Sequence, residues 1–303
     1  MMGRMSDSWQ SWKTDEHVIR WRPSQPPHGA AQATGAAGTG EPTAPAVAAR
    51  PAPSPVLLLN GAGLVSGGWR EVWERLRQGE IITVDRPGYR GTTRRRLPTL
   101  PGEVRVLARV LDRLGTGPVT VAAHSMAAFQ AEALARLRPD LVRGVVLVDP
   151  SLLVSSARRP RLAGPLWQAA RHSLALRPVR ELAQMGFRAG LRSQTHRPQE
   201  TGRREWERTW DSQAALAAGA AEWLSYGQQA AALDQLRRRQ DAPATACAVV
   251  LQAPPYASRA QEEALGEAFA AVELRQVPHS RHLMMLDAPE QIVAAIRQMS
   301  ERS

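Results

Sequence analysis

The serine at position 125 of this 303-residue chain has the neighbours that a nucleophile needs. Residues 123–127 read AHSMA; the apolar run 119–122 precedes them, and the helix-forming stretch 129–137 follows. A strand that turns sharply into a helix at a serine holds that side chain in a strained, exposed position, and small residues on either side let the turn close. The segment therefore predicts nucleophilic chemistry, provided that a general base and oxyanion donors lie around Ser125.

The remaining reactive side chains favour structural roles. Cys247 is the single cysteine and lies in an apolar run, so we interpret it as a core residue. One cysteine excludes an internal disulfide framework and is typical of a reducing compartment, so we expect a cytoplasmic protein. The seven histidines show no metal-ligand spacing, and no metal site is predicted.

The elements that would position Ser125 alternate in type from residue 56 onward. Expected strands cover residues 56–59, 81–84, 119–122, 145–148, 248–251 and 274–277. Amphipathic helices are expected between most of them, over residues 69–76, 103–114, 129–137, 261–269 and 289–299. Buried strands separated by helices predict an α/β fold with a doubly wound, mostly parallel sheet.

Composition divides the chain into three regions. Residues 1–55 are interpreted as an N-terminal tail, largely disordered and rich in Pro, Ala and Gly. Its apolar residues Trp9, Trp12, Val18, Ile19 and Trp21 could instead form a short strand or a hydrophobic tether. Residues 56–150 and 244–303 form the expected core. Residues 151–243 predict helices only, so we expect a helical cap over the sheet edge where ligands bind. Four tryptophans there could line an apolar pocket or pack as cap core: Trp167, Trp206, Trp210 and Trp223.

The net charge of +11 comes almost entirely from arginine. The short runs at 94–96, 158–159 and 237–239 carry no interleaved aromatics and match no nucleic-acid-binding motif. We interpret them as solvated faces and expect no nucleic-acid partner. No apolar run approaches the ~20 residues that span a bilayer, and residues 1–21 lack a signal-peptide apolar region. The sequence gives no indication of an oligomeric state.

Four segments in order resemble the α/β-hydrolase superfamily over residues 56–299. Residues 57–63 (LLLNGAG) are similar to the strand and His-Gly-x-Gly loop that build the oxyanion hole. Residues 85–92 (DRPGYRGT) resemble the family's Asp-x-Pro-Gly-x-Gly-x-Ser loop, and the turn at Ser125 resembles its nucleophile elbow. Residues 279–290 (HSRHLMMLDAPE) resemble its terminal histidine loop. The resemblance implies an α/β-hydrolase fold, a small-molecule substrate and no cofactor.

The resemblance also implies roles for individual residues. His282 is the favoured general base, and His279 is the alternative three residues before it. The backbone N–H groups of Ala62 and Met126 would form the oxyanion hole. Asn60 replaces the family's common histidine, and its amide could hold the loop by hydrogen bonding in the same way.

The acid departs from the family pattern. The usual site follows the strand at 248–251, but no carboxylate occurs there before Glu262. Asp149 follows the preceding strand, where some members, haloalkane dehalogenases among them, carry the acid. We expect Asp149 to be the catalytic acid, with a structural aspartate that caps the turn as the alternative. Asp85 is interpreted as structural.

These residues predict a serine hydrolase that cleaves an ester, thioester or lactone of a small, apolar substrate through an acyl-enzyme. His124, beside the nucleophile, is expected to pack or line the pocket wall. The alternative is a catalytically inactive α/β-hydrolase fold that serves as a binding module. The missing late acid, the alanines at the elbow and Asn60 favour that alternative, whereas Ser125 and His282 in their contexts favour the enzyme.

Overall fold

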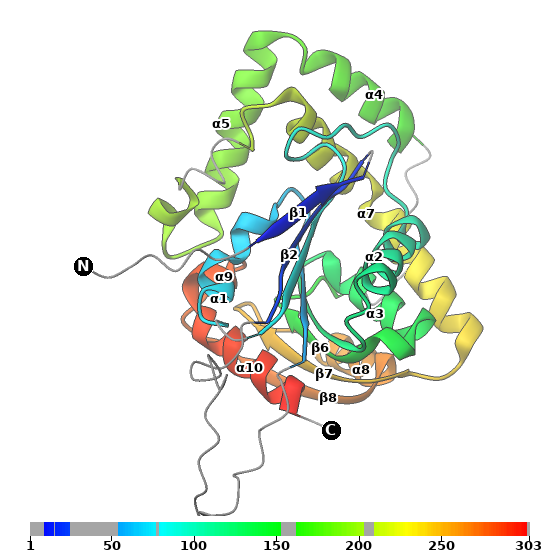
Figure 1. The fold of residues 1–303 in the computed structure, drawn as a ribbon. Helices are drawn as coiled ribbons and strands as arrows, with labels where there is room; N and C mark the ends of the chain where they lie inside the picture. The colour runs from blue at the N-terminus through cyan, green and yellow to red at the C-terminus, as the bar shows by residue number, and fades with distance from the viewer. Residues whose placement is uncertain are drawn as a thin grey trace, which may run out of the picture.

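The computed structural model describes residues 9–14, 16–24, 54–76, 79–152, 162–202 and 209–301. Their centre is an eight-stranded sheet with the order β1-β2-β4-β3-β5-β6-β7-β8 (Figure 1). The strands are β1 (Gln10–Lys13), β2 (Val18–Arg22), β3 (Val56–Leu59), β4 (Ile81–Asp85), β5 (Val119–His124), β6 (Val142–Val148), β7 (Ala244–Gln252) and β8 (Phe269–Gln276). From β4 to β8 all neighbours pair in parallel, whereas β1 and β2 are antiparallel. The mostly parallel sheet expected from the sequence is confirmed.

Helices cover both faces of the sheet because each central strand is apolar on both sides. In β3, Leu57 and Leu59 pack in one core cluster while Val56 and Leu58 pack in the other, as the two-residue period of a strand requires. The first cluster includes α2 (Leu100–Leu114), α3 (Ala127–Leu137) and α8 (Arg259–Ala268). The second includes η1 (Ser66–Trp69), α1 (Arg70–Trp73), α9 (Met284–Asp287) and α10 (Pro289–Glu301). A short η2 (Pro139–Leu141) precedes β6.

The N-terminal tryptophan-rich segment belongs to the sheet. Strands β1 and β2 form a hairpin that extends the sheet beyond β4, and Ile19 is fully buried opposite Val84. Arg22 is buried too and donates to the carbonyl oxygens of Trp73, Leu76 and Gly79. The expected tail over residues 1–55 is therefore wrong for residues 10–13 and 18–22. These residues form strands, which was the alternative, because apolar side chains there pack in the core. Residues 25–53 lie outside the described residues.

Between β6 and β7, the described residues 162–202 and 209–240 are mostly helical. It contains α4 (Ala163–Ser173), α5 (Arg177–Ser193), η3 (Pro198–Gly202) and α7 (Gln213–Gln240). We call residues 162–240 the helical insertion. In Figure 1, α4 and α5 lie above the sheet, and α7 extends from beneath them past α2 and α3. Ser212 caps the N-terminus of α7, because its side chain accepts a hydrogen bond from Ala215 N. No helix in the described parts of the chain is long and apolar enough to cross a bilayer.

Candidate active site

Ser125 lies at the junction of β5 and α3, in a sharp turn. Its backbone adopts a φ of 54°, in the left-handed region that a residue with a side chain rarely occupies. Its N–H donates to Val148 O on the neighbouring strand β6 at 3.1 Å, which anchors the turn. The loop after β3 packs closely on the same turn, since a Cβ added at Gly61 would lie 3.0 Å from the Ser125 Cβ. Only glycine fits at position 61.

His282 lies in the loop between β8 and α9 and reaches Ser125. Its Nε2 is 3.0 Å from Ser125 Oγ, and its Nδ1 is 2.5 Å from Asp149 Oδ2. The side chain is 35% exposed, so the ring is accessible from solvent on one side. His279, the alternative base, is exposed in the turn before it. The structure therefore brings His282, and not His279, to the serine.

Asp149 follows β6 and is held at both carboxylate oxygens. Its backbone has a φ of 42°, and its N–H donates to Leu251 O on β7 at 2.8 Å. Oδ1 accepts a hydrogen bond from Ala253 N at 3.0 Å, which leaves Oδ2 directed at His282. The end of β7, where the family pattern would place the acid, supplies instead a backbone donor that orients Asp149.

His124 packs against the ring of His282, with ring centroids 4.6 Å apart. It is buried, and its Nε2 lies 2.8 Å from the carbonyl oxygen of His282. Burial, followed by the charges of His282 and Arg86, lowers the pKa of His124 well below its usual value. The neutral ring must then donate from Nε2, because a carbonyl oxygen can only accept. His124 thus supports the histidine loop.

The two expected oxyanion donors lie in the segments that meet at Ser125. Ala62 follows Gly61 in the loop after β3, and Met126 follows the nucleophile at the start of α3. The N–H groups of Ala62 and Met126 take part in none of the hydrogen bonds found among the described residues. They are available to a substrate oxygen, and their role as an oxyanion hole stays a prediction.

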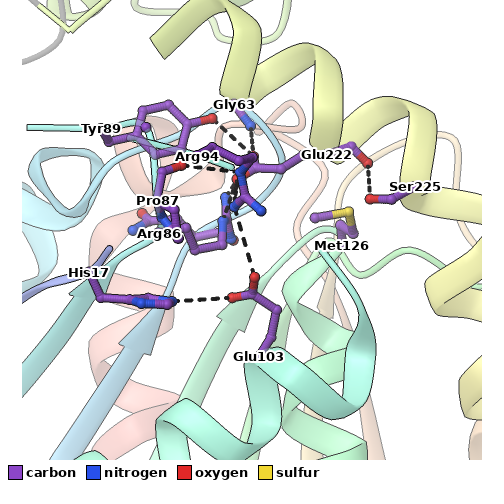
Figure 2. Close-up of polar contacts among 12 residues, drawn as sticks. His17, Gly63, Arg86, Pro87, Tyr89, Arg94, Glu103, Met126, Glu222 and Ser225 are labelled. Carbon is purple, nitrogen blue, oxygen red and sulfur yellow. Dashed lines mark hydrogen bonds and ion pairs between the residues drawn. The ribbon is translucent and has the colours of Figure 1, made fainter. Parts of the chain in front are cut away.

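The loop at residues 60–63 follows β3, and we call it the oxyanion loop after the role predicted for Ala62. Sequence reasoning missed the residues that hold this loop. Asn60 is buried, but its side-chain amide has no hydrogen-bond partner in the described parts of the chain. The loop is held instead by Arg86, which donates to the carbonyl oxygens of Asn60 and Gly61, and by Glu222, which accepts from Gly63 N (Figure 2). Arg86 stands beside Asp85 in the DRPGYRGT segment, but Glu222 lies on α7 and no local pattern indicated it.

Asp85 has a structural role close to the loop. Its carboxylate accepts hydrogen bonds from the N–H and the hydroxyl of Ser66 at 2.6 and 2.9 Å, and it pairs with Arg90. These contacts fix the start of η1.

The tryptophans of the helical insertion differ in environment. Trp167 and Trp210 are buried, whereas Trp223 is 63% exposed and Trp206 lies outside the described residues. Trp210 stacks on Phe187 with ring centroids 3.8 Å apart. A Cβ added at Gly63 would lie 2.9 Å from Phe187 and 3.5 Å from Trp210, so this aromatic pair borders the oxyanion loop.

No metal centre is evident in the ranges given above. Among those residues, no three His, Cys, Asp or Glu side chains gather where they could hold a metal ion.

Comparisons with known proteins identify a family and similar folds. The model of the alpha/beta hydrolase family matches residues 56–295. Lipase LipV of Mycobacterium tuberculosis is 32% identical over 106 residues, which span 35% of this chain and 41% of that protein. Cfl2 of Burkholderia cenocepacia superimposes with a TM-score of 0.69 at 18% identity, covering 97% of this chain and 95% of that one. A thermophilic esterase from Thermogutta terrifontis superimposes with a TM-score of 0.63 at 18% identity, covering 95% and 97%. At such identities the two structures establish the fold.

Proposed function

The chain belongs to the alpha/beta hydrolase family, and from that premise we propose that it is a serine hydrolase with Ser125, His282 and Asp149 as its catalytic triad. One observation carries the proposal. The ring of His282 links the other two side chains by hydrogen bonds. Its Nε2 lies 3.0 Å from Ser125 Oγ, and its Nδ1 lies 2.5 Å from Asp149 Oδ2. A hydroxyl, an imidazole and a carboxylate in this order are what nucleophilic acyl transfer requires.

Acylation follows from this geometry. His282 Nε2 takes the proton of Ser125 as Oγ forms a bond to the carbonyl carbon of the substrate. Asp149 keeps the ring in the correct tautomer and stabilises the imidazolium. The negative charge that develops on the carbonyl oxygen is stabilised by the N–H groups of Ala62 and Met126, and the N-terminus of α3 adds positive potential.

The second half of acylation and the deacylation that follows use the same groups. The imidazolium of His282 gives its proton to the leaving group as the bond between the carbonyl carbon and that group breaks. Water then attacks the ester formed at Ser125, with His282 as the base. The acid product leaves and the serine hydroxyl is restored. These steps call on no metal and no organic cofactor.

The substrate we propose is a small ester, thioester or lactone with an apolar acyl group. The stacked rings of Phe187 and Trp210 beside the oxyanion loop support an apolar acyl site. The matched relative named as a lipase and the similar structure named as an esterase support ester chemistry.

The helical insertion would serve as the cap of this site. Phe187 on α5 and Glu222 on α7 both reach the loop at Gly63, which supports a cap docked over the oxyanion hole. The alternative is an inactive member of the fold that binds a ligand without turning it over.

Active-site labelling separates the enzyme from the binding module. We expect a fluorophosphonate to label the protein at Ser125 and a panel of p-nitrophenyl esters to be hydrolysed. Ser125→Ala should abolish labelling and lower kcat by about a millionfold, the scale on which a triad serine acts. A folded protein that neither labels nor hydrolyses any ester would contradict the proposal and favour the binding module.

A further inference from the structure

A cluster of buried charges lies between the helical insertion and the oxyanion loop (Figure 2). Its centre is Glu222 on α7, whose side chain is fully buried. Burying a carboxylate costs free energy unless hydrogen-bond donors and opposite charges compensate the loss of water.

Glu222 is satisfied by four donors. Arg86 donates from Nε to Oε1 at 2.7 Å and from Nη2 to Oε2 at 3.0 Å. The hydroxyl of Tyr89 and the backbone N–H of Gly63 donate to Oε2 at 3.0 and 2.8 Å. One carboxylate on the helical insertion therefore binds the loop after β4 and the loop after β3 at once.

Arg86 holds the other side of the oxyanion loop. Its Nη1 donates to Asn60 O and its Nη2 donates to Gly61 O, each at 2.6 Å. The guanidinium is buried and paired, and although burial disfavours its charge, Glu222 raises its pKa above the usual value. Arg86 therefore stays charged at any working pH.

These contacts fix the two peptide planes on either side of Ala62. A trans peptide is planar, with its C=O and N–H pointing in opposite directions. Because Gly61 O points at Arg86, the N–H of Ala62 in the same plane must point away from Arg86. Because Gly63 N points at Glu222, the C=O of Ala62 must point away from Glu222. The orientation of the Ala62 N–H is thus set by the pair.

The pair has charged neighbours. Arg94 lies 3.5 Å from Glu222 and 3.8 Å from Glu103, which in turn lies 3.9 Å from His17. Two arginines thus face two glutamates in the buried cluster. Helix α7 also contacts the second expected donor residue, since Gln229 Nε2 lies 3.8 Å from Met126 Sδ.

We propose that Glu222, acting with Arg86, is a positioning residue that aims the Ala62 N–H at the substrate oxyanion, so that docking of α7 completes the oxyanion hole. The proposal rests on the serine hydrolase function proposed above. An oxyanion donor acts mainly in the transition state, so misaiming it lowers kcat and leaves KM nearly unchanged.

The test compares Glu222→Gln with Glu132→Gln. Glu132 is a matched control, because it is buried, pairs with Arg136 and with Arg237 of α7, and contacts neither loop of the site. We expect Glu222→Gln to lower kcat for a p-nitrophenyl ester about ten- to hundredfold, below the full loss of a donor. Glu132→Gln should keep the wild-type kcat per folded molecule. Arg86→Lys tests the same idea if Glu222→Gln does not fold, because a lysine cannot bind both carbonyl oxygens and Glu222.

Amide hydrogen exchange at Gly63 gives a readout that needs no activity. Exchange at Gly63 should become faster in Glu222→Gln and stay unchanged in Glu132→Gln. If both variants lose kcat only in proportion to unfolded protein, and Gly63 stays protected, the positioning role is overturned. If the wild type hydrolyses nothing, the proposed function fails, while the exchange result still decides whether Glu222 holds the loop.

Discussion

At the level of single residues, the carboxylate that contacts His282 lies at a different place in the chain from the one that the family pattern suggests. Asp149 reaches His282 from the end of β6, although the family resemblance places the acid after the next strand. The neighbouring strand still contributes, because Ala253 N at the end of β7 donates to Asp149 Oδ1. Asp149 therefore starts from β6 but is held by backbone groups at the end of β7.

Replacement of Asp149 by asparagine should remove most of the activity. An amide in this place no longer stabilises the imidazolium and favours the wrong tautomer of His282, which costs about 10⁴ in kcat in a comparable triad. The measurement is kcat for a p-nitrophenyl ester. Glu262→Gln is the control, because Glu262 is the first carboxylate after β7 and should leave kcat near the wild-type value. Wild-type kcat in Asp149→Asn would assign the acid elsewhere.

The pH dependence should distinguish His124 from His282, whose rings are in contact. A general base works only when unprotonated, so kcat/KM should fall as the pH drops through the pKa of the base. Burial keeps the pKa of His124 well below its usual value, so this ring gains a proton only at a lower pH than an ordinary histidine does. His124→Phe should therefore lower kcat/KM, by about tenfold for the lost bond to His282 O, and retain the acid limb of the profile.

Loss of the acid limb in His124→Phe would contradict this prediction. If His124→Phe abolished the acid limb, then His124 would be the group that titrates, and the assignment of His282 as the base would need revision. The measurement is kcat/KM between about pH 5 and 9, a range that brackets an ordinary histidine.

At the level of elements, the sequence was informative wherever a short local pattern defines a structure. Each of the six expected strands is present, and β3 has the expected bounds, because continuous apolar runs mark strands buried on both faces. The last expected strand, at residues 274–277, overlaps only the end of β8 (Phe269–Gln276). This edge strand leaves Leu274 and Gln276 exposed and Glu273 and Arg275 partly buried. An edge strand with polar side chains lacks the continuous apolar run.

Contacts between distant segments could not be predicted in the same way. Arg86 and Glu222 lie 136 positions apart, and the contact depends on how α7 docks on two loops. Asn60 illustrates the difficulty, because its type suits hydrogen bonding while its buried amide finds no partner in the described chain. Ser125, His282 and Asp149 could be grouped in advance only because the family resemblance supplied their order. The spacing of residues 149 and 282 alone indicates no contact.

At the level of the whole molecule, some of the excess arginines form buried or partly buried ion pairs. The expectation that the arginine runs are solvated faces is wrong for these residues. Arg94 of the run 94–96 is buried in the cluster around Glu222, and Arg237 of the run 237–239 pairs with Glu132 on α3. Residues 158–159 lie outside the described residues. Arginine suits such sites because its planar fork binds carboxylates and carbonyl oxygens together. Part of the charge therefore joins the helical insertion to the core.

The N-terminal hairpin should likewise contribute to the stability of the whole molecule. Ile19 on β2 is fully buried beside Val84 and within the core cluster of α2, whereas Ser11 on β1 is exposed. Ile19→Asp places a charge in that core and should lower the free energy of unfolding by about 3 kcal/mol or more. Ser11→Asp adds the same side chain at the surface and should change it by no more than about 0.5 kcal/mol. Denaturant unfolding of both variants decides the matter: equal stabilities would mean that residues 10–22 behave as a tail, and a gap of this size means that the hydrolase core begins at β1.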